Sequence, residues 1–229
     1  MRIKLIIIII LVLFVLGIAV VLGFSFLQSL EDRTRANVNE SPLSLEVVNL
    51  NDSSVTVIWN TTDDTSGKVN LYGSDSKATV VLDDRDVSTN ADTNKRKIHF
   101  ATIKNLTAST KYTFTILSND KEYFNNTARW DLTTLKTPSS ALVPKPIYGQ
   151  ANVDTGGKGE ILIKMIAKTT SGDSLTLANL STSSGTYSFD LSSLRTSTGE
   201  VMYLNTNDQL LITMSSESNK QAQIIANIK

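Results

Sequence analysis

The sequence contains no cysteine and only one histidine, His99, which excludes several kinds of chemistry. Without cysteine there can be no disulfide, thiolate metal site or cysteine nucleophile. A histidine-based catalytic centre needs a nucleophile and an orienting acid within hydrogen-bond reach of His99. No serine or aspartate stands in a recognisable catalytic motif such as Gly-x-Ser-x-Gly. We therefore predict a protein that is not an enzyme, binds no cofactor or metal ion, and uses His99 as a framework residue.

An excess of charge of either sign is also missing, because 22 basic residues balance 22 acidic ones. A nucleic-acid-binding domain needs a basic face that releases counterions, so we predict no nucleic-acid partner. Glycine and proline are scarce, at 11 and 4 residues, whereas Ser, Thr, Asn, Asp, Val and Ile are plentiful. This mixture is typical of short strands joined by polar turns.

The most conspicuous feature that is present is an apolar run from Leu5 to Leu27. Its length of about 23 residues is enough to cross a bilayer core as a helix. Arg2 and Lys4 precede it, which favours a cytoplasmic N terminus. We therefore predict a signal-anchor transmembrane helix over residues 1–28, a polar stalk over 29–41, and a single-pass protein of the cell membrane whose remainder is extracytoplasmic, at the cell surface.

Two alternatives exist for this N-terminal segment. A cleaved signal peptide has a shorter apolar region, normally about 7–15 residues, followed by a small-residue cleavage site. No good site of that kind follows here, in "GFSFLQSLEDR". A pilin-type helix would have a glycine processing site and a glutamate near the start of the run, and neither is present. Both alternatives are therefore weaker than the anchor.

Three of the four prolines, Pro138, Pro144 and Pro146, lie close together and predict a stiff linker over residues 137–146. On each side of it, apolar and polar residues alternate in short runs bounded by polar turns, as in strands. Residues 42–136 contain seven such runs, a number and spacing typical of a β-sandwich. Residues 147–229 contain further runs of the same type. We predict an all-β fold with two tandem immunoglobulin-like β-sandwiches after the helix.

The stretch "HFATIKNLTASTKYTFTIL" resembles the E–F region of fibronectin type III domains, whose pattern is Leu-x-Pro-x-Thr-x-Tyr. Leu106, Thr110 and Tyr112 match this pattern, and Ala108 replaces the proline. "GKVNLYGSD" together with "HF" is similar to the fibronectin-type domain that precedes the catalytic domain of purple acid phosphatases. The resemblance covers residues 42–136 and implies a tyrosine corner, in which the Tyr112 hydroxyl bonds to the backbone just upstream. It also implies framework positions for Trp59 and His99.

The second segment, with "YGQ" and "GTYSFDLSSLRT", resembles the carboxypeptidase-regulatory-like, transthyretin-like sandwiches of bacterial surface proteins. Gly149 and the run Gly185, Tyr187 and Phe189 carry the resemblance. "GEILIKMIAK" departs from the small-residue strand that is usual in this family. Despite their name, domains of this family are not peptidases, so the resemblance implies a second sandwich and no chemistry.

Two groups of residues are candidates for ligand contact. Tyr123 and Phe124 can form an exposed aromatic patch for a glycan or a protein, or can pack at the start of the last strand. Asp83, Asp84, Asp86 and Asp92 can supply oxygen ligands for calcium. Their loop lacks the regular spacing of a calcium loop and contains basic residues, so we interpret it as a solvated loop.

These observations predict a membrane-anchored, structural or adhesion-like protein of the bacterial cell envelope, which displays its modules for protein binding or scaffolding. The expected partners are the membrane, through residues 5–27, and an unknown protein or wall polymer. The alternative is a module that binds carbohydrate or cell-wall polymer. An enzyme is a further hypothesis, and it would require His99 in a pocket beside a carboxylate or a serine.

Overall fold

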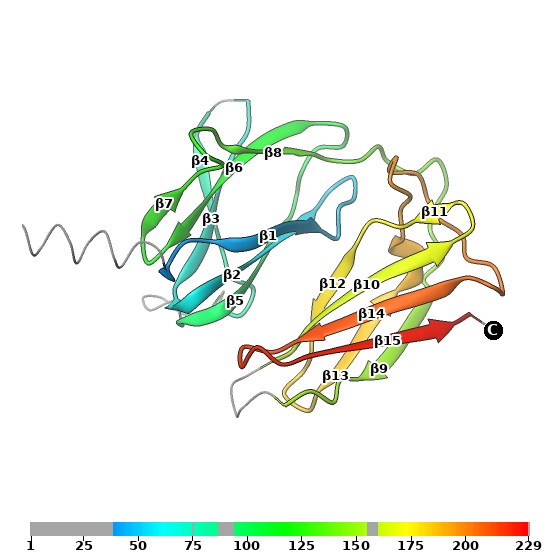
Figure 1. Ribbon diagram of the computed structural model, residues 1–229. Coiled ribbons are helices and arrows are strands. Elements are labelled where there is room, and N and C mark those ends of the chain that lie inside the picture. Colours follow the sequence, from blue (N-terminus) through cyan, green and yellow to red (C-terminus); the bar gives the residue numbers. More distant parts are fainter. Residues whose placement is uncertain (1–38, 75, 87–93, 155–159, 229) are drawn as a thin grey trace, which may run out of the picture. The chain divides into compact units, whose positions relative to one another are not determined.

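The computed structural model describes residues 39–74, 76–86, 94–154 and 160–228 (Figure 1). Residues from Pro42 onwards form one compact unit. Its regular elements are strands, apart from one short 3-10 helix, η1 (Leu191–Ser193), so the prediction of an all-β protein is confirmed. No helix within the described ranges is long and apolar enough to cross a membrane. The anchor predicted over residues 5–27 lies outside those ranges.

Strands β1 to β8 build a first sandwich of two antiparallel sheets. One sheet has the order β1-β2-β5; the other has the order β4-β3-β6, and both β7 and β8 pair with β6. The strands are β1 (Leu43–Val48), β2 (Val55–Thr65), β3 (Gly67–Tyr72), β4 (Ala78–Leu82), β5 (Arg96–Ile103), β6 (Lys111–Ser118), β7 (Lys121–Tyr123) and β8 (Trp130–Thr133).

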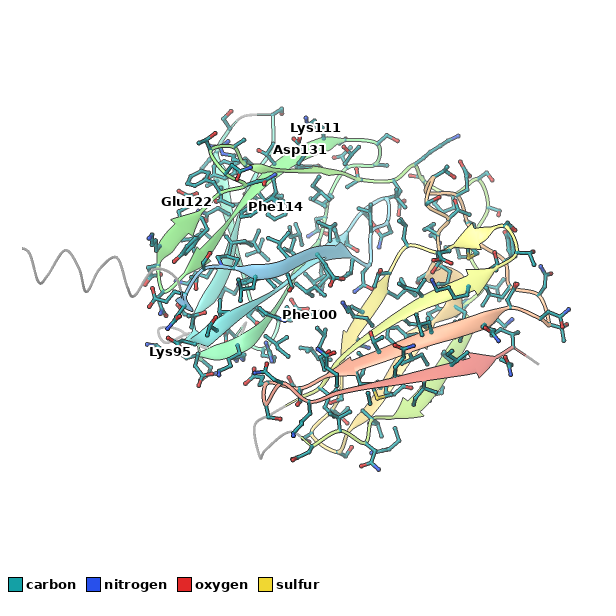
Figure 2. The ribbon with its side chains drawn as sticks, viewed as in Figure 1. Lys95, Phe100, Lys111, Phe114, Glu122 and Asp131 are labelled. Carbon is teal, nitrogen blue, oxygen red and sulfur yellow. The ribbon has the colours of Figure 1, made fainter. Side chains whose placement is uncertain are left out.

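The core of the first sandwich follows from the alternation of side chains along its strands. Val55, Val57 and Trp59 on β2 have no exposed surface, and they pack with inward-facing Phe114 and Ile116 of β6. Because successive side chains of a strand point to opposite faces, the intervening positions of β6 face outward. Lys111 of β6, for example, forms an exposed ion pair of 2.9 Å with Asp131 of β8 (Figure 2).

A tyrosine hydroxyl fixes the connection that leads into β6. The Thr107 N–H donates to the Tyr112 hydroxyl at 3.0 Å, five residues along the chain. Tyr112 and Leu106 both pack against the core of the first sandwich. The backbone bond that the fibronectin resemblance implies for Tyr112 is therefore present, with Thr107 as the donor.

Strands β9 to β15 build a second sandwich. The larger sheet has the order β11-β10-β14-β15, with β12 also pairing with β10, and the smaller sheet contains β9 and β13 (Figure 1). Inward-facing residues of both sheets, such as Met165 and Phe189, share one core. The strands are β9 (Pro146–Gln150), β10 (Leu162–Thr169), β11 (Gly172–Asp173), β12 (Leu177–Leu180), β13 (Thr186–Asp190), β14 (Gln209–Ser215) and β15 (Gln221–Asn227).

Packing in the second sandwich explains why residue 149 is a glycine. It lies opposite Tyr187 in the pairing of β9 with β13. A Cβ atom at residue 149 would overlap the Tyr187 ring, so the ring occupies the space that a side chain would need. Tyr187 in turn makes an edge-to-face contact with Phe189 at 5.8 Å between ring centroids. Tyr187 thus contacts both Gly149 and Phe189, two of the other residues that carry the second resemblance, whereas membership of that family stays a prediction.

The two sandwiches meet at Asn49, which follows β1. Its amide nitrogen donates to the Ala178 carbonyl at 2.8 Å, and its amide oxygen accepts from the Ala178 N–H at 2.8 Å. The Asn49 backbone N–H donates to the Thr176 carbonyl at 3.0 Å. Asn49 therefore satisfies the outer edge of β12 as a neighbouring strand would. A small apolar cluster from both sandwiches lies at the same junction: Val48, Ile58, Ile98, Phe100, Leu162 and Ala178.

We expect Asn49→Gly to weaken this junction selectively. Asn49 has a φ of 51°, a conformation that glycine adopts without strain, so the substitution removes the amide and spares the backbone. Leaving the Ala178 groups without partners should cost about 1–3 kcal/mol. Hydrogen exchange of the Ala178 amide should accelerate accordingly. Asn105→Gly is the matched control, because Asn105 has a φ of 60° and is exposed. Equal effects of the two substitutions would contradict this role of Asn49.

Candidate functional site

His99 lies on β5 in the interior of the first sandwich, with no exposed surface. Its ring stacks on Trp59 with 4.7 Å between centroids and 14° between planes. Its Nε2 atom lies 3.0 Å from the Thr65 hydroxyl. The space for the imidazole comes partly from Gly67, where a Cβ atom would overlap both the His99 and the Trp59 rings.

Burial lowers the pKa of His99 to about 4. The Asp83 carboxylate, 3.8 Å from His99 Nδ1, opposes this effect, whereas the positive charges of Arg85 and Arg96 add to it. The imidazole is therefore neutral at pH 7. A ring without exposed surface offers no substrate access to its nitrogens, so these contacts support a framework role for His99.

The interpretation of residues 83–96 as a solvated loop is wrong for Asp83, Asp86 and Arg96, which are buried, whereas Asp84 and Lys95 are exposed. Asp83 and Asp86 have no exposed surface. Two nitrogens of Arg85 bind the two Asp83 oxygens at 2.8 Å each, and Arg96 holds Asp86 in the same bidentate manner. Buried carboxylates are tolerated only when they are paired in this way. The charges of Asp83 and Asp86 are therefore neutralised inside the fold by Arg85 and Arg96.

The pKa of Asp83 shows the balance of these forces. Burial alone would raise it, but the hydrogen bonds and the charge of Arg85, together with the Phe100 N–H, bring it below its ordinary value. Arg85 also donates to the Ile98 carbonyl at 2.6 Å, and it approaches Glu160 and Glu217 of the second sandwich within 4 Å. Among the described residues no group of acidic or histidine side chains is arranged to hold a metal ion; Asp92 lies outside them.

The two aromatic candidates, Tyr123 and Phe124, are differently placed. Tyr123 lies opposite Ile116 in the pairing of β7 with β6, and is half-buried, with the Lys121 ammonium 5.3 Å from its ring centroid. Phe124, the next residue, is 42% exposed. The register therefore directs Tyr123 towards the core side, and a ligand contact shared by both rings stays a prediction.

The polar side chains on the outer face beside these rings satisfy one another's hydrogen-bonding groups. Glu122, which is labelled in Figure 2, accepts hydrogen bonds from the hydroxyls of Thr115 and Tyr72 and, at 3.4 Å, from the Asn70 amide. The Thr115 bond is the largest cause of a lowered Glu122 pKa. Arg129 lies over the Tyr72 ring at 3.4 Å. These side chains stabilise one another and leave little polar capacity for a ligand.

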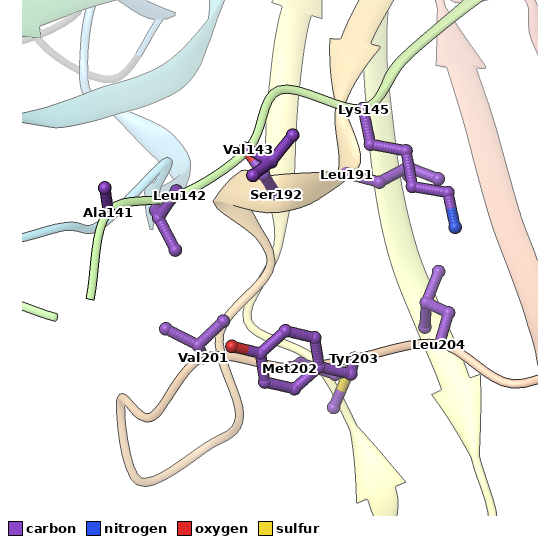
Figure 3. A pocket seen from close by; sticks show the side chains of 10 residues that line it. All are labelled: Ala141, Leu142, Val143, Lys145, Leu191, Ser192, Val201, Met202, Tyr203 and Leu204. Carbon is purple, nitrogen blue, oxygen red and sulfur yellow. The ribbon is translucent and has the colours of Figure 1, made fainter. Parts of the chain in front are cut away.

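An exposed apolar groove is the surface that sequence reasoning did not anticipate. It has a volume of about 250 Å³ and lies between the linker and residues 201–204. Figure 3 shows Leu142 and Val143 on one side of the hollow and Val201, Met202 and Tyr203 on the other. Val143 is 81% exposed and Tyr203 is 76% exposed. Side chains of this size are costly to leave in water, so the groove is a candidate binding surface.

The walls of this groove are held by the backbone. The Lys145 N–H donates to Asp190 at 2.7 Å, and the Lys145 carbonyl accepts from the Leu191 N–H at 3.0 Å. On the opposite wall, the Met202 N–H donates to the Leu194 carbonyl at 3.0 Å. These bonds fix the backbone of one wall at Lys145 and of the other at Met202.

Comparison with known families agrees with the geometry of the first sandwich. Residues 41–134 match the family described as "Purple acid Phosphatase, N-terminal domain". The first sandwich is fibronectin type III-like. The match ends before the linker and includes none of the groove. It includes His99 and Trp59.

A solved structure described as "Central Fibronectin-III array of RIM-binding protein" is similar at 14% identity with a TM-score of 0.27. The similarity covers 82% of this chain and 64% of that chain, so this chain spans less than two thirds of its length. A comparison with curated protein sequences returns no match.

We expect the buried imidazole to make the protein less stable in acid. Unfolded His99 binds a proton as the pH falls below about 6.5, whereas the buried ring does so only near pH 4. The free energy of unfolding therefore decreases progressively as the pH falls from about 6.5 towards 4. Above pH 6.5 His99 is neutral in both states, and this loss of stability is absent. Between pH 7 and pH 4.5 the wild type should lose about 2–3 kcal/mol more than His99→Gln, measured by urea unfolding with tryptophan fluorescence. Equal losses would contradict a buried, neutral His99.

Gly67→Ala tests the contact between β3 and the stacked rings. The added methyl would overlap His99 and Trp59, and both rings are completely buried, so we expect a cost of about 1–3 kcal/mol. In a His99→Ala background one of the two obstructing rings is gone, and Gly67→Ala should cost less. A double-mutant cycle measured by urea unfolding gives the difference. The same cost in both backgrounds would show that the ring is not the obstacle.

Proposed function

We propose that this chain is a non-catalytic binding module that holds a protein partner at the cell envelope of a bacterium. Residues 5–27 would anchor it in the membrane, with the sandwiches outside the cytoplasm. The observation that carries the binding role is the exposed apolar groove beside the linker. The fibronectin type III-like fold of residues 41–134 is compatible with a structural or binding module.

The chemistry of the groove favours an extended peptide segment as its ligand. Its surface is mostly aliphatic, with the flat Tyr203 ring at one side. Exposed aromatic rings of this kind are enriched among residues that dominate binding energy in protein interfaces. Lys145 lines the same hollow and forms no ion pair with any residue in the described ranges. The fitting segment therefore has an apolar side chain and a nearby carboxylate.

A neighbouring hollow continues the groove along the linker. It is lined by Lys136, Pro138 and Ser139 on one side and by Glu200 on the other, and it shares Val201 and Tyr203 with the apolar groove. An extended chain could thus run along the linker, with polar contacts at one end and apolar contacts at the other. This continuity supports a peptide more than a compact small molecule.

Binding of carbohydrate or wall polymer is the second candidate function. The observation in its favour is the exposed ring of Phe124 beside Tyr123 and Lys121. Sugars stack on exposed aromatic faces, but the inward register of Tyr123 reduces the available ring surface. We therefore place this candidate after the protein-binding groove.

Photo-cross-linking in intact cells tests the proposed function. A photoreactive phenylalanine analogue at Tyr203 should capture one particular protein, which mass spectrometry then identifies. The matched control carries the analogue at Tyr148, a tyrosine of β9 that is 79% exposed but does not line the groove. Capture of the same proteins from both positions, or none from Tyr203, would contradict the groove. Capture of glycan from Phe124 alone would favour the second candidate.

A further inference from the structure

Strand β15 forms one edge of the larger sheet in the second sandwich. It pairs along its whole length with β14, from Gln221 opposite Ser215 to Asn227 opposite Gln209. No strand within the described ranges pairs with its other side. The edge is seven residues long and contains neither a charged residue nor a proline.

The hydrogen bonds at its two ends show which backbone groups point outward. The Ile228 N–H donates to the Asp208 carbonyl, and the Lys220 carbonyl accepts from the Ser216 N–H. In an antiparallel ladder, residues alternate between those bonded to the neighbouring strand and those whose groups face away. Even-numbered residues therefore bond to β14. The N–H and C=O groups of the odd-numbered residues face the open side: Gln221, Gln223, Ile225 and Asn227.

Several other edges of the protein are blocked, each by a different device. Asn49 covers β12, as described above. β9 begins with Pro146, which has no N–H to donate. β1 has a register shift between Leu43 and Glu46. The chain after β4 turns to β5, where the Asp84 N–H donates to the Phe100 carbonyl. Proteins manage exposed edges in this way because such edges recruit other strands.

The side chains of β15 do not protect its edge. Ile224 is 46% exposed and Ile225 is 58% exposed, and they lie on opposite faces of the sheet. Ile224 lies opposite buried Ile212 of β14, so it belongs to the core-facing side yet is incompletely covered. Apolar surface is therefore available on both faces of a free strand edge.

We propose that β15 pairs antiparallel with β15 of a second copy of this chain, about a two-fold axis at Ile224. A second copy fits this edge because the strand is complementary to itself in one register. In that register Gln221 lies opposite Asn227 and Gln223 opposite Ile225, so the outward-facing residues meet each other. Each such pair exchanges two hydrogen bonds, and every outward N–H and C=O of the strand acquires a partner.

The side chains agree with the same register. Ile224 meets Ile224 of the second copy in a non-hydrogen-bonded pair, the closer of the two pair types. Ile225 approaches the other Ile225 diagonally on the opposite face. Lys220 falls opposite Ile228, so no like charges are opposed. A contact that uses the same patch on both copies closes as a dimer and does not extend into a filament.

Single cysteines provide the first test, because the sequence has none of its own. The full-length Ile224→Cys variant, in its membrane or in mild detergent, should form a disulfide-linked dimer on gentle oxidation. Residues paired across the two-fold axis fall near the lower end of the Cα separations that a disulfide spans. Tyr148→Cys is the exposed control. We expect Ile224→Cys to cross-link about tenfold faster or more, and equal rates would overturn the proposal.

A backbone substitution provides the second test. Gln223→Pro removes an outward N–H that β14 does not use, so the fold keeps its own ladder while the dimer loses a hydrogen bond and meets a ring. Combined with Ile224→Cys, it should abolish the cross-link, whereas Gln223→Ala should leave the cross-link intact. Retention of the cross-link with Gln223→Pro overturns the proposal. So does a monomeric Ile224→Cys chain whose introduced thiol captures a different protein, because the edge would then accept a foreign strand.

Discussion

The junction between the two sandwiches depends on the two-sided hydrogen bonding of Asn49 to Ala178. A single amide side chain satisfies both backbone groups of an edge residue, at 2.8 Å each, and its own backbone N–H reaches Thr176. Because the left-handed φ of 51° turns the chain away from β1 at this residue, the amide can point at β12. The neighbouring apolar cluster adds packing from both sandwiches, and these hydrogen bonds fix the direction in which β1 meets β12.

Buried charge imposes the second constraint on the molecule. Asp83 and Asp86 could be removed from water only because Arg85 and Arg96 accompany them in the same loop. The same cations help to keep His99 neutral, and its imidazole stacks on the Trp59 ring. Carboxylate, guanidinium and imidazole groups would suggest catalysis in an open pocket. Here they contact one another inside a β-sandwich. The proposed binding role therefore falls to surfaces with spare capacity, such as the linker groove.

The sequence was informative where the pattern was local. Alternation along β2 and the Leu-x-x-x-Thr-x-Tyr pattern ending at Tyr112 depend on neighbouring residues, and both led to the fibronectin-like sandwich. The solvated-loop interpretation failed for Asp83 and Asp86 because their pairing with Arg85 and Arg96 depends on the loop turning inward, which the sequence pattern does not show. The groove was missed for a related reason. Val143 and Tyr203 are 60 positions apart (203 − 143), and only the chain path of the second sandwich brings them together. A run of apolar residues beside prolines, "ALVPKPIYG", was the available signal.

The order of strands in the larger sheet relates the junction to the open edge. β12 and β15 lie on opposite sides of the pair β10 and β14, so the edge that Asn49 covers is not the edge that remains free. Pairing at β15 would therefore leave the contact between the two sandwiches intact. The groove shares no residue with β15 either. A dimer formed through β15 would present two grooves, and a partner with two matching segments would bind with an avidity that neither groove has alone.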